Sequence, residues 1–191
     1  DIFIKLSKAK GFRSRAAYKL LEINQKFKVI KKNSKVIDLG ASPGGWTQVV
    51  AELQNNKNEI VAIDKKPMDP MVNCKFINQD ISGFLKTNQN LQRNYFDVIL
   101  SDMASNSSGH RFTDQINAEK IYYLAKEFAL RYLALKGNFV CKFFRNSIEK
   151  NIVQEIKKNF KIAKIYKPNS SRKDSKEIYL IAIGFNNLHK Y

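Results

Sequence analysis

Short runs of apolar and β-branched residues alternate with segments of helical periodicity along this chain. The runs predict strands at residues 35–39, 59–64, 74–77, 95–100 and 137–144. Apolar residues spaced three and four apart predict helices at residues 14–27, 46–53, 114–135 and 148–160. Helical crossovers join strands that run parallel in one sheet. The pattern therefore predicts an α/β fold with a mostly parallel sheet and helices on both of its faces.

The last two strand-like runs break this alternation. They lie at residues 161–166 and 177–184, and the loop at 167–176 joins them without a helix. Consecutive strands joined in this way pair most simply as antiparallel neighbours. We therefore expect the last two strands of the chain to be antiparallel to each other.

The length of 191 residues suits one domain that buries most of its apolar surface around a single core. No internal repeat, low-complexity linker or second domain is evident in the sequence. We expect a single domain over residues 1–191, in which residues 1–30 form a basic segment and a first helix and residues 31–191 form the α/β core.

The charge of the chain is strongly unbalanced. It contains 34 Lys and Arg residues against 17 Asp and Glu residues, which gives a formal net charge of +17. Such an excess suits a polyanionic partner, and nucleic acid fits better than a membrane because no strongly amphipathic basic helix stands out. The alternative is that a codon bias toward Lys, Asn and Ile supplies surface lysines with no binding role.

The cysteines and histidines do not form a metal-binding pattern. Cys74 and Cys141 lie in separate apolar runs without a CxxC motif, and His110 and His189 share no ligand spacing with them. We expect two reduced core thiols in an intracellular, monomeric protein, with no metal. No run approaches the roughly 18 apolar residues that span a bilayer, so we expect no membrane contact. The chain begins at Asp1 rather than Met, so we expect a missing leader and read no targeting signal.

A glycine-rich loop, DLGASPGGW at residues 38–46, follows the first strand and precedes a helix. Open α/β sheets bind ligands at this place, because glycines let the backbone approach the ligand and the helix offers free N–H groups. Ser42 stands where a GxGxxG dinucleotide loop has its second glycine, and GKS or GKT is missing, which counts against an oxidoreductase and against an NTPase. We expect a ligand contact from the loop residues Asp38, Gly40, Gly44 and Gly45.

Carboxylates stand at or just past the ends of the first three strands. They are Asp38, Asp64 and Asp80. An acid at the second strand end can accept hydrogen bonds from both ribose hydroxyls of an adenosine, and Asp80 is placed to meet the adenine amino group. The alternative is a tight turn with acids that only cap helices. The coincidence of all three carboxylates with strand ends favours a nucleoside ligand.

Lys142 interrupts the apolar run GNFVCKFF at residues 137–144. Burial of an ammonium group costs free energy unless the group is paired. The lysine therefore either extends its ammonium to water or has a function at a buried site.

Successive motifs of the chain resemble those of the FtsJ/RrmJ family of ribosomal RNA 2′-O-methyltransferases. The motifs are GFRSRAAYKL, DLGASPGGW, IDKKPMDP, LSDMASNSSG, VCKFF and PNSSRKDSKEIYLIA, in order over nearly the whole chain. The resemblance implies a Rossmann-like methyltransferase fold with a seven-stranded sheet whose last strand is antiparallel, and S-adenosylmethionine as cofactor. One departure is Ser105, where bacterial members have proline, and we expect it to alter loop stiffness rather than chemistry.

The resemblance also implies the roles of individual residues. The catalytic tetrad it implies is Lys19, Asp102, Lys142 and Glu177. The cofactor residues it implies are Gly44, Trp46, Asp64, Asp80 and Asp102. In this interpretation Lys142 takes the proton of the ribose hydroxyl or guides it away. Burial and Lys19 would lower the pKa of Lys142 while Asp102 and Glu177 would raise it, and the sequence leaves that balance open.

Two clusters of basic residues flank members of the tetrad and are candidates for phosphate contacts. One consists of Lys5, Lys8, Lys10, Arg13 and Arg15 before the first helix, and the other of Arg172, Lys173 and Lys176 before Glu177. We expect an RNA substrate, most simply a uridine of large-subunit ribosomal RNA. The alternatives are transfer RNA, a messenger RNA cap, or a catalytically silent RNA-binding module. Cytoplasm, nucleolus and an organelle such as the mitochondrion all stay open as compartments.

Overall fold

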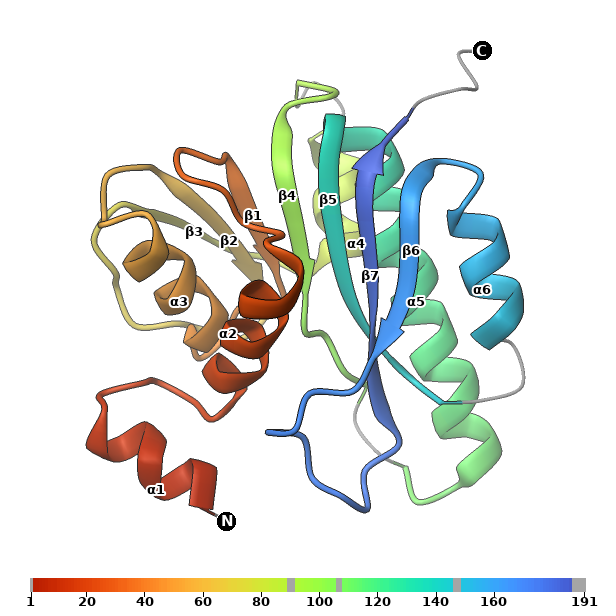
Figure 1. Ribbon diagram of the computed structural model, residues 1–191, viewed down its shortest axis with the longest axis horizontal. Coiled ribbons are helices and arrows are strands. Elements are labelled where there is room, and N and C mark those ends of the chain that lie inside the picture. The colour runs from red at the N-terminus through yellow and green to blue at the C-terminus, as the bar shows by residue number, and fades with distance from the viewer. Residues whose placement is uncertain (1, 89–91, 106–107, 146–148, 187–191) are drawn as a thin grey trace.

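Seven strands form one sheet in the order β3-β2-β1-β4-β5-β7-β6 (Figure 1). The computed structural model describes residues 2–88, 92–105, 108–145 and 149–186. In chain order the strands are β1 (Val36–Leu39), β2 (Ile60–Asp64), β3 (Cys74–Asn78), β4 (Phe96–Ser101), β5 (Leu133–Phe144), β6 (Phe160–Tyr166) and β7 (Glu177–Phe185).

The first five strands are parallel, and β7 runs against both of its neighbours. β1 pairs in parallel with β2 and β4, and β4 pairs in parallel with β5. β7 is antiparallel to β5 and to β6. The expected antiparallel last strand of a mostly parallel sheet is therefore confirmed, and this strand, β7, lies between β5 and the edge strand β6.

Six helices are described, and five of them cover the two faces of the sheet. They are α1 (Ile2–Ala9), α2 (Ala16–Phe27), α3 (Gly45–Leu53), α4 (Ile81–Thr87), α5 (Arg111–Tyr132) and α6 (Glu149–Ile156). Residues of α2 and α3 share one core cluster with strand residues such as Val98, and residues of α4, α5 and α6 share the other with strand residues such as Ile99. Successive strand residues point to opposite faces, so strands that are apolar along almost their whole length contribute side chains to both core clusters. No helix in the described part of the chain is both long and apolar enough to cross a membrane.

Three local features differ from the sequence-based expectations. α1 forms within the basic N-terminal segment and packs Phe3 against Tyr18, with ring centres 5.4 Å apart. α4 forms in a stretch where the sequence analysis predicted no helix, and the Asp80 carboxylate caps its start. α5 ends at Tyr132 rather than at residue 135, because Leu133 already pairs with Phe96 of β4.

The sheet has two chemically different ends. β1, β2 and β4 finish at the same end, where the glycine loop and Asp102 follow them. β7 begins at that end too, because Glu177 pairs with Phe144 and Tyr179 pairs with Lys142. The antiparallel β6–β7 hairpin therefore places Glu177 at the same end of the sheet as Asp102 and Lys142, which follow or lie in parallel strands.

Candidate active site

The four residues of the predicted tetrad meet as two ion pairs. Lys19 on α2 places its Nζ 2.6 Å from Oε1 of Glu177 at the start of β7. Lys142 on β5 places its Nζ 3.2 Å from Oδ1 of Asp102, and it also donates a hydrogen bond of 2.6 Å to the Asp102 backbone carbonyl. The Lys142 side chain is only 7% exposed. The lysine that interrupts the apolar strand is therefore buried and paired.

Tyr179 links the two pairs, although the sequence analysis did not single it out. Its hydroxyl donates a hydrogen bond of 2.8 Å to Oδ1 of Asp102, and its ring centre lies 5.9 Å from Nζ of Lys19. Burial, with the nearby Asp102 and Glu177 carboxylates, raises the pKa of Tyr179 well above its ordinary value. The phenol therefore stays protonated and serves as a donor. It stands two residues after Glu177, and the two-residue period of a strand would have placed it on the same face.

The Glu177 carboxylate stays ionised despite its partial burial. Burial raises its pKa, but the opposing charges of Lys19 and Lys142 and a hydrogen bond from Ser171 outweigh that effect, so the pKa is lowered overall. The Ser171 hydroxyl oxygen lies 3.1 Å from Oε1 of Glu177. Attraction and hydrogen bonding to the charged form thus exceed the desolvation cost.

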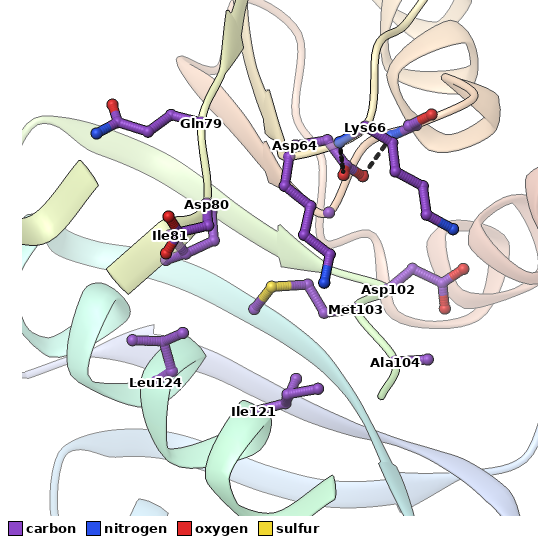
Figure 2. A pocket seen from close by; sticks show the side chains of 13 residues that line it. Asp64, Lys66, Gln79, Asp80, Ile81, Asp102, Met103, Ala104, Ile121 and Leu124 are labelled. Atoms are coloured by element: carbon purple, nitrogen blue, oxygen red, sulfur yellow. Dashed lines mark hydrogen bonds between the residues drawn. The ribbon is translucent and has the colours of Figure 1, made fainter. Parts of the chain in front are cut away.

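A cavity of about 330 Å³ lies beside the tetrad, at the carboxyl ends of the strands (Figure 2). Four of the predicted cofactor residues line it: Gly40, Asp64, Asp80 and Asp102. The lining residues that the sequence analysis missed are Ser42, Lys65, Lys66, Gln79, Ile81, Met103, Ala104, Ile121 and Leu124. In Figure 2, Asp64 and Lys66 face Ile121 and Leu124 across the cavity. The site thus combines a carboxylate side with an apolar side.

Backbone amides hold the Asp64 carboxylate at the end of β2. One oxygen accepts a hydrogen bond of 2.9 Å from the Ser42 N–H, and the other accepts one of 2.8 Å from the Lys66 N–H (Figure 2). Each carboxylate oxygen has a further lone pair, so Asp64 can still accept hydrogen bonds from a ligand.

Asp80 also has a local structural role at the cavity. Its Oδ1 accepts hydrogen bonds from the Ser82 hydroxyl at 2.6 Å and from the Gly83 N–H at 2.9 Å. These bonds lower the pKa of Asp80. Asp80 therefore caps α4 and lines the cavity with the same carboxylate.

The glycine loop brings backbone close to the cavity wall. Gly40 has a φ of +75°, and a Cβ added there would lie 2.4 Å from Cγ of Met103. Gly44, with a φ of +104°, is the N-cap of α3. A side chain at Gly40 would collide with Met103 and would also be strained in this backbone conformation. Glycine is therefore needed where the loop meets the segment that carries Asp102.

Four predicted cofactor residues lie outside the cavity lining: Asp38, Gly44, Gly45 and Trp46. Trp46 is 2% exposed; its Nε1 donates a hydrogen bond of 2.8 Å to the Ala16 carbonyl, and its ring lies 5.7 Å from that of Tyr179. It therefore fixes the start of α2, the helix of Lys19, against α3.

Asp38 is fully buried behind the loop. One of its oxygens accepts a hydrogen bond of 2.7 Å from the Thr47 hydroxyl. Burial raises the pKa of Asp38 to about 7. Its contacts thus tie the end of β1 to the start of α3.

The predicted RNA contacts differ in exposure, with Arg13 and Arg15 half-buried and the others exposed. Arg13 donates hydrogen bonds of 2.7 Å to the carbonyls of Asp69 and Pro70, so its guanidinium holds the loop after β2. Arg15 donates to the Ser170 carbonyl, and burial together with the nearby Arg172 lowers its pKa. The exposed basic residues are Arg172, Lys173 and Lys176 in the loop, and Lys5, Lys8 and Lys10 at α1.

Glu22 clamps the loop before β7 to α2, a contact that the sequence analysis missed. Its two carboxylate oxygens accept hydrogen bonds from the N–H groups of Asn169, at 2.7 Å, and Ser170, at 2.8 Å. The next residue, Ser171, bonds Glu177. The loop that presents Arg172 and Lys173 is therefore held by the helix that carries Lys19.

Two sequence expectations fall partly outside what the structure describes. Ser105 is half-buried, and residues 106–107 after it are not described.

Across the described ranges, no three His, Cys, Asp or Glu residues are grouped in a way that could hold a metal ion. Cys141 is buried and Cys74 half-buried, and neither forms a disulfide. His189 lies beyond the described residues.

Known proteins resemble this chain over most of its length, not only at the residues of the site. The model of a family described as FtsJ-like methyltransferase matches residues 12–185. Ribosomal RNA large subunit methyltransferase E of Rickettsia bellii (strain RML369-C) is 42% identical over 193 residues, which cover 96% of this chain and 84% of the relative. The protein of the same name from Anaplasma phagocytophilum (strain HZ) is 42% identical over 190 residues, which cover 97% of this chain and 77% of the relative.

A solved structure agrees with these relatives. A crystal structure described as a ribosomal RNA methyltransferase from Plasmodium falciparum superposes with a TM-score of 0.80 at 35% identity, over 91% of this chain and 98% of that chain. The fold, the ordered motifs and the matched family model lead to one assignment: this chain belongs to the FtsJ-like methyltransferase family.

Proposed function

We propose that this protein transfers a methyl group from S-adenosylmethionine to a ribose 2′-hydroxyl of large-subunit ribosomal RNA. The observation that carries the proposal is the Lys142 ammonium, which is 7% exposed and held by Asp102, a residue that also lines the cavity. The names of the relatives from Rickettsia and Anaplasma favour large-subunit ribosomal RNA over transfer RNA or a messenger RNA cap.

The cavity fits an adenosine-containing cofactor. Its volume of about 330 Å³ falls in the range of small-molecule sites. Asp64 is placed to accept hydrogen bonds from the ribose hydroxyls, and Ile81, Ile121 and Leu124 offer an apolar surface for the adenine ring. When bound, S-adenosylmethionine would supply a methyl group on a cationic sulfur, which a nucleophilic oxygen can displace directly.

The tetrad would position the acceptor and handle its proton. Lys142 is fixed by two contacts to Asp102, and Asp102 is fixed in turn by the Tyr179 hydroxyl. Such a rigid arrangement holds the acceptor oxygen near the methyl carbon, which can lower the barrier by several kcal/mol. In this proposal Lys142 Nζ takes the hydroxyl proton or guides it away, and the Lys19–Glu177 pair positions the ribose.

The RNA would approach over the exposed cations around the tetrad. Arg172, Lys173 and Lys176 lie in the loop that precedes Glu177. Phosphate contacts from such side chains supply affinity and make it depend on salt. Arg13, whose guanidinium is bound to backbone carbonyls, would stabilise the site rather than contact RNA.

The decisive variant is Lys142→Ala. If Lys142 handles the proton, methyl transfer to ribosomal RNA falls by about 10²- to 10⁴-fold. Binding of S-adenosylmethionine, measured separately by calorimetry, stays within a few-fold of wild type because the cavity is lined by other residues. Lys164→Ala on the exposed face of β6 is the matched control. Full transfer by Lys142→Ala would exclude this role, and no transfer by the wild-type protein would favour a silent RNA-binding module.

A further inference from the structure

The end of the sheet opposite the active site carries a second group of exposed basic residues. Strand pairing places Ile60, Val36, Val98 and Asn138 side by side, so the segments before these residues reach one end of the sheet. β6 starts at the same end, because Ile162 pairs with Ile183 and Ile183 pairs with Asn138. The exposed cations of these segments, which we call the amino-end cluster, are Lys31, Lys32, Lys35, Lys57, Arg93, Lys136, Lys157, Lys158 and Lys161.

Few acidic groups oppose this cluster. In the same segments lie Glu59, which is exposed, and Asp97, whose carboxylate accepts a hydrogen bond of 2.8 Å from the Lys35 N–H. Where the chain is described, no ion pair involves a member of the cluster. Lys35 Nζ lies 4.2 Å from the Tyr95 ring centre, and the other lysine heads are available to an anionic partner.

The cluster is separated from the active site by the length of the sheet. From Asn138, which pairs with Val98 and Ile183 at the amino end, to Lys142 the strand advances four residues, which is roughly 13 Å at about 3.3 Å per residue. In Figure 1 the loops that carry the cluster lie at the top, and α1, the loop before β7 and the start of α5 lie at the bottom. An RNA fragment shorter than this separation would not reach both ends.

We propose that the amino-end cluster binds the phosphate backbone of a second segment of the same folded ribosomal RNA, away from the methylated nucleotide. This inference rests on the proposed function. RNA fits better than a protein partner because protein interfaces have an apolar and aromatic centre, whereas here the large exposed apolar side chains, Leu135 at 64% and Ile162 at 37%, stand among many lysines. Lysine-rich, polar surfaces are typical of nucleic-acid interfaces.

Engagement of both ends by one RNA would make the second contact intramolecular. The effective concentration of the second segment is then set by the fold of the RNA rather than by its bulk concentration. A large folded RNA would gain binding affinity from contacts with both surfaces, whereas a short RNA would gain affinity from the active-site surface alone. The cluster would thus make the enzyme prefer structured ribosomal RNA.

The test compares two pairs of substitutions that change the net charge equally. Lys31→Gln/Lys32→Gln removes two charges from the cluster, and Lys120→Gln/Lys164→Gln removes two exposed charges from the middle of α5 and β6. The probes are a large-subunit ribosomal RNA transcript and a short single-stranded oligouridylate. Binding is measured across a salt series, and methylation of the transcript is measured in parallel.

The cluster pair is expected to bind the transcript roughly tenfold more weakly at low salt, with the slope of log K against log salt reduced by about one to two. Its affinity for oligouridylate and the behaviour of the control pair should match wild type. The inference would be overturned if both pairs lost affinity for the transcript equally, or if the cluster pair lost as much affinity for oligouridylate as for the transcript. It would also be overturned if the cluster pair lost no affinity, and that result would leave an acidic protein as the partner. The binding result stands whatever the methylation assay gives, because methylation tests only the proposed function.

Discussion

At the carboxyl end of the sheet, Lys19 and Lys142 are 11% and 7% exposed and each lies against a carboxylate, whereas at the amino end Lys31 and Lys32 are exposed. A buried ammonium is stable only beside an opposite charge, so its position is fixed to within a hydrogen bond. An exposed ammonium is hydrated by water, so it needs no paired carboxylate and its side chain keeps its conformational freedom. The first arrangement suits chemistry on one atom, and the second suits attraction to a phosphate backbone.

The largest expected effect comes from breaking one buried pair. Glu177→Gln would leave the Lys19 ammonium without its partner at 2.6 Å, close to a second lysine. We expect the free energy of unfolding to fall by about 3 to 5 kcal/mol, whereas Lys32→Gln at the amino end should change it by less than about 0.5 kcal/mol. Urea unfolding of both variants measures the difference.

The double variant Lys19→Met/Glu177→Met separates stability from chemistry. Removal of both charges should restore most of the lost stability, because an apolar pair can replace a buried ion pair. Methyl transfer should stay low in the double variant. If Glu177→Gln were no more destabilising than Lys32→Gln, the contrast between the two ends of the sheet would be wrong.

An intermediate effect is expected at Asp38, the buried acid behind the glycine loop. Its pKa is raised to about 7 by burial, so the folded state holds a proton that the unfolded chain releases near pH 4. Its contribution to stability is therefore complete below about pH 4 and is lost as the pH rises toward 7. Asp38→Asn should remove this loss, so that the variant gains about 2 to 4 kcal/mol on wild type between pH 4 and pH 8.

Unfolding of both proteins across this pH range tests the prediction, because other titrating groups cancel in the difference. Thr47→Val gives a control of opposite sign. It removes the hydroxyl that stabilises the Asp38 carboxylate at 2.7 Å, so the pKa of Asp38 should rise further, and the loss of stability should be larger and extend to higher pH. A pH-independent difference between wild type and Asp38→Asn would contradict the raised pKa.

Much of the site was predictable because it depends on strand ends and on one lysine in an apolar run. Lys142, Asp102 and Asp64 each sit in or directly after a strand, and parallel pairing brings such positions to one end of a sheet. Tyr179 and Glu22 were missed because their roles depend on partners 77 and 147 residues away in sequence. α5 stopped early for a similar reason, since pairing of Leu133 with β4 overrides its local helical pattern.

The smallest expected effect concerns the link between the RNA-facing loop and the tetrad. Glu22→Gln replaces a carboxylate that accepts two backbone N–H groups by an amide with a single acceptor oxygen, so one of these contacts weakens. The loop with Arg172 and Lys173 should become less ordered, and the KM for ribosomal RNA should rise a few-fold. Because Glu22 touches neither the cavity nor the Lys142–Asp102 pair, kcat should change little. Steady-state kinetics on the same RNA, with Glu127→Gln on the exposed face of α5 as control, measures this split. A fall in kcat at unchanged KM would instead mean that the loop acts on Glu177 through Ser171. In that case the loop with Arg172 and Lys173 could not be altered without an effect on the catalytic tetrad.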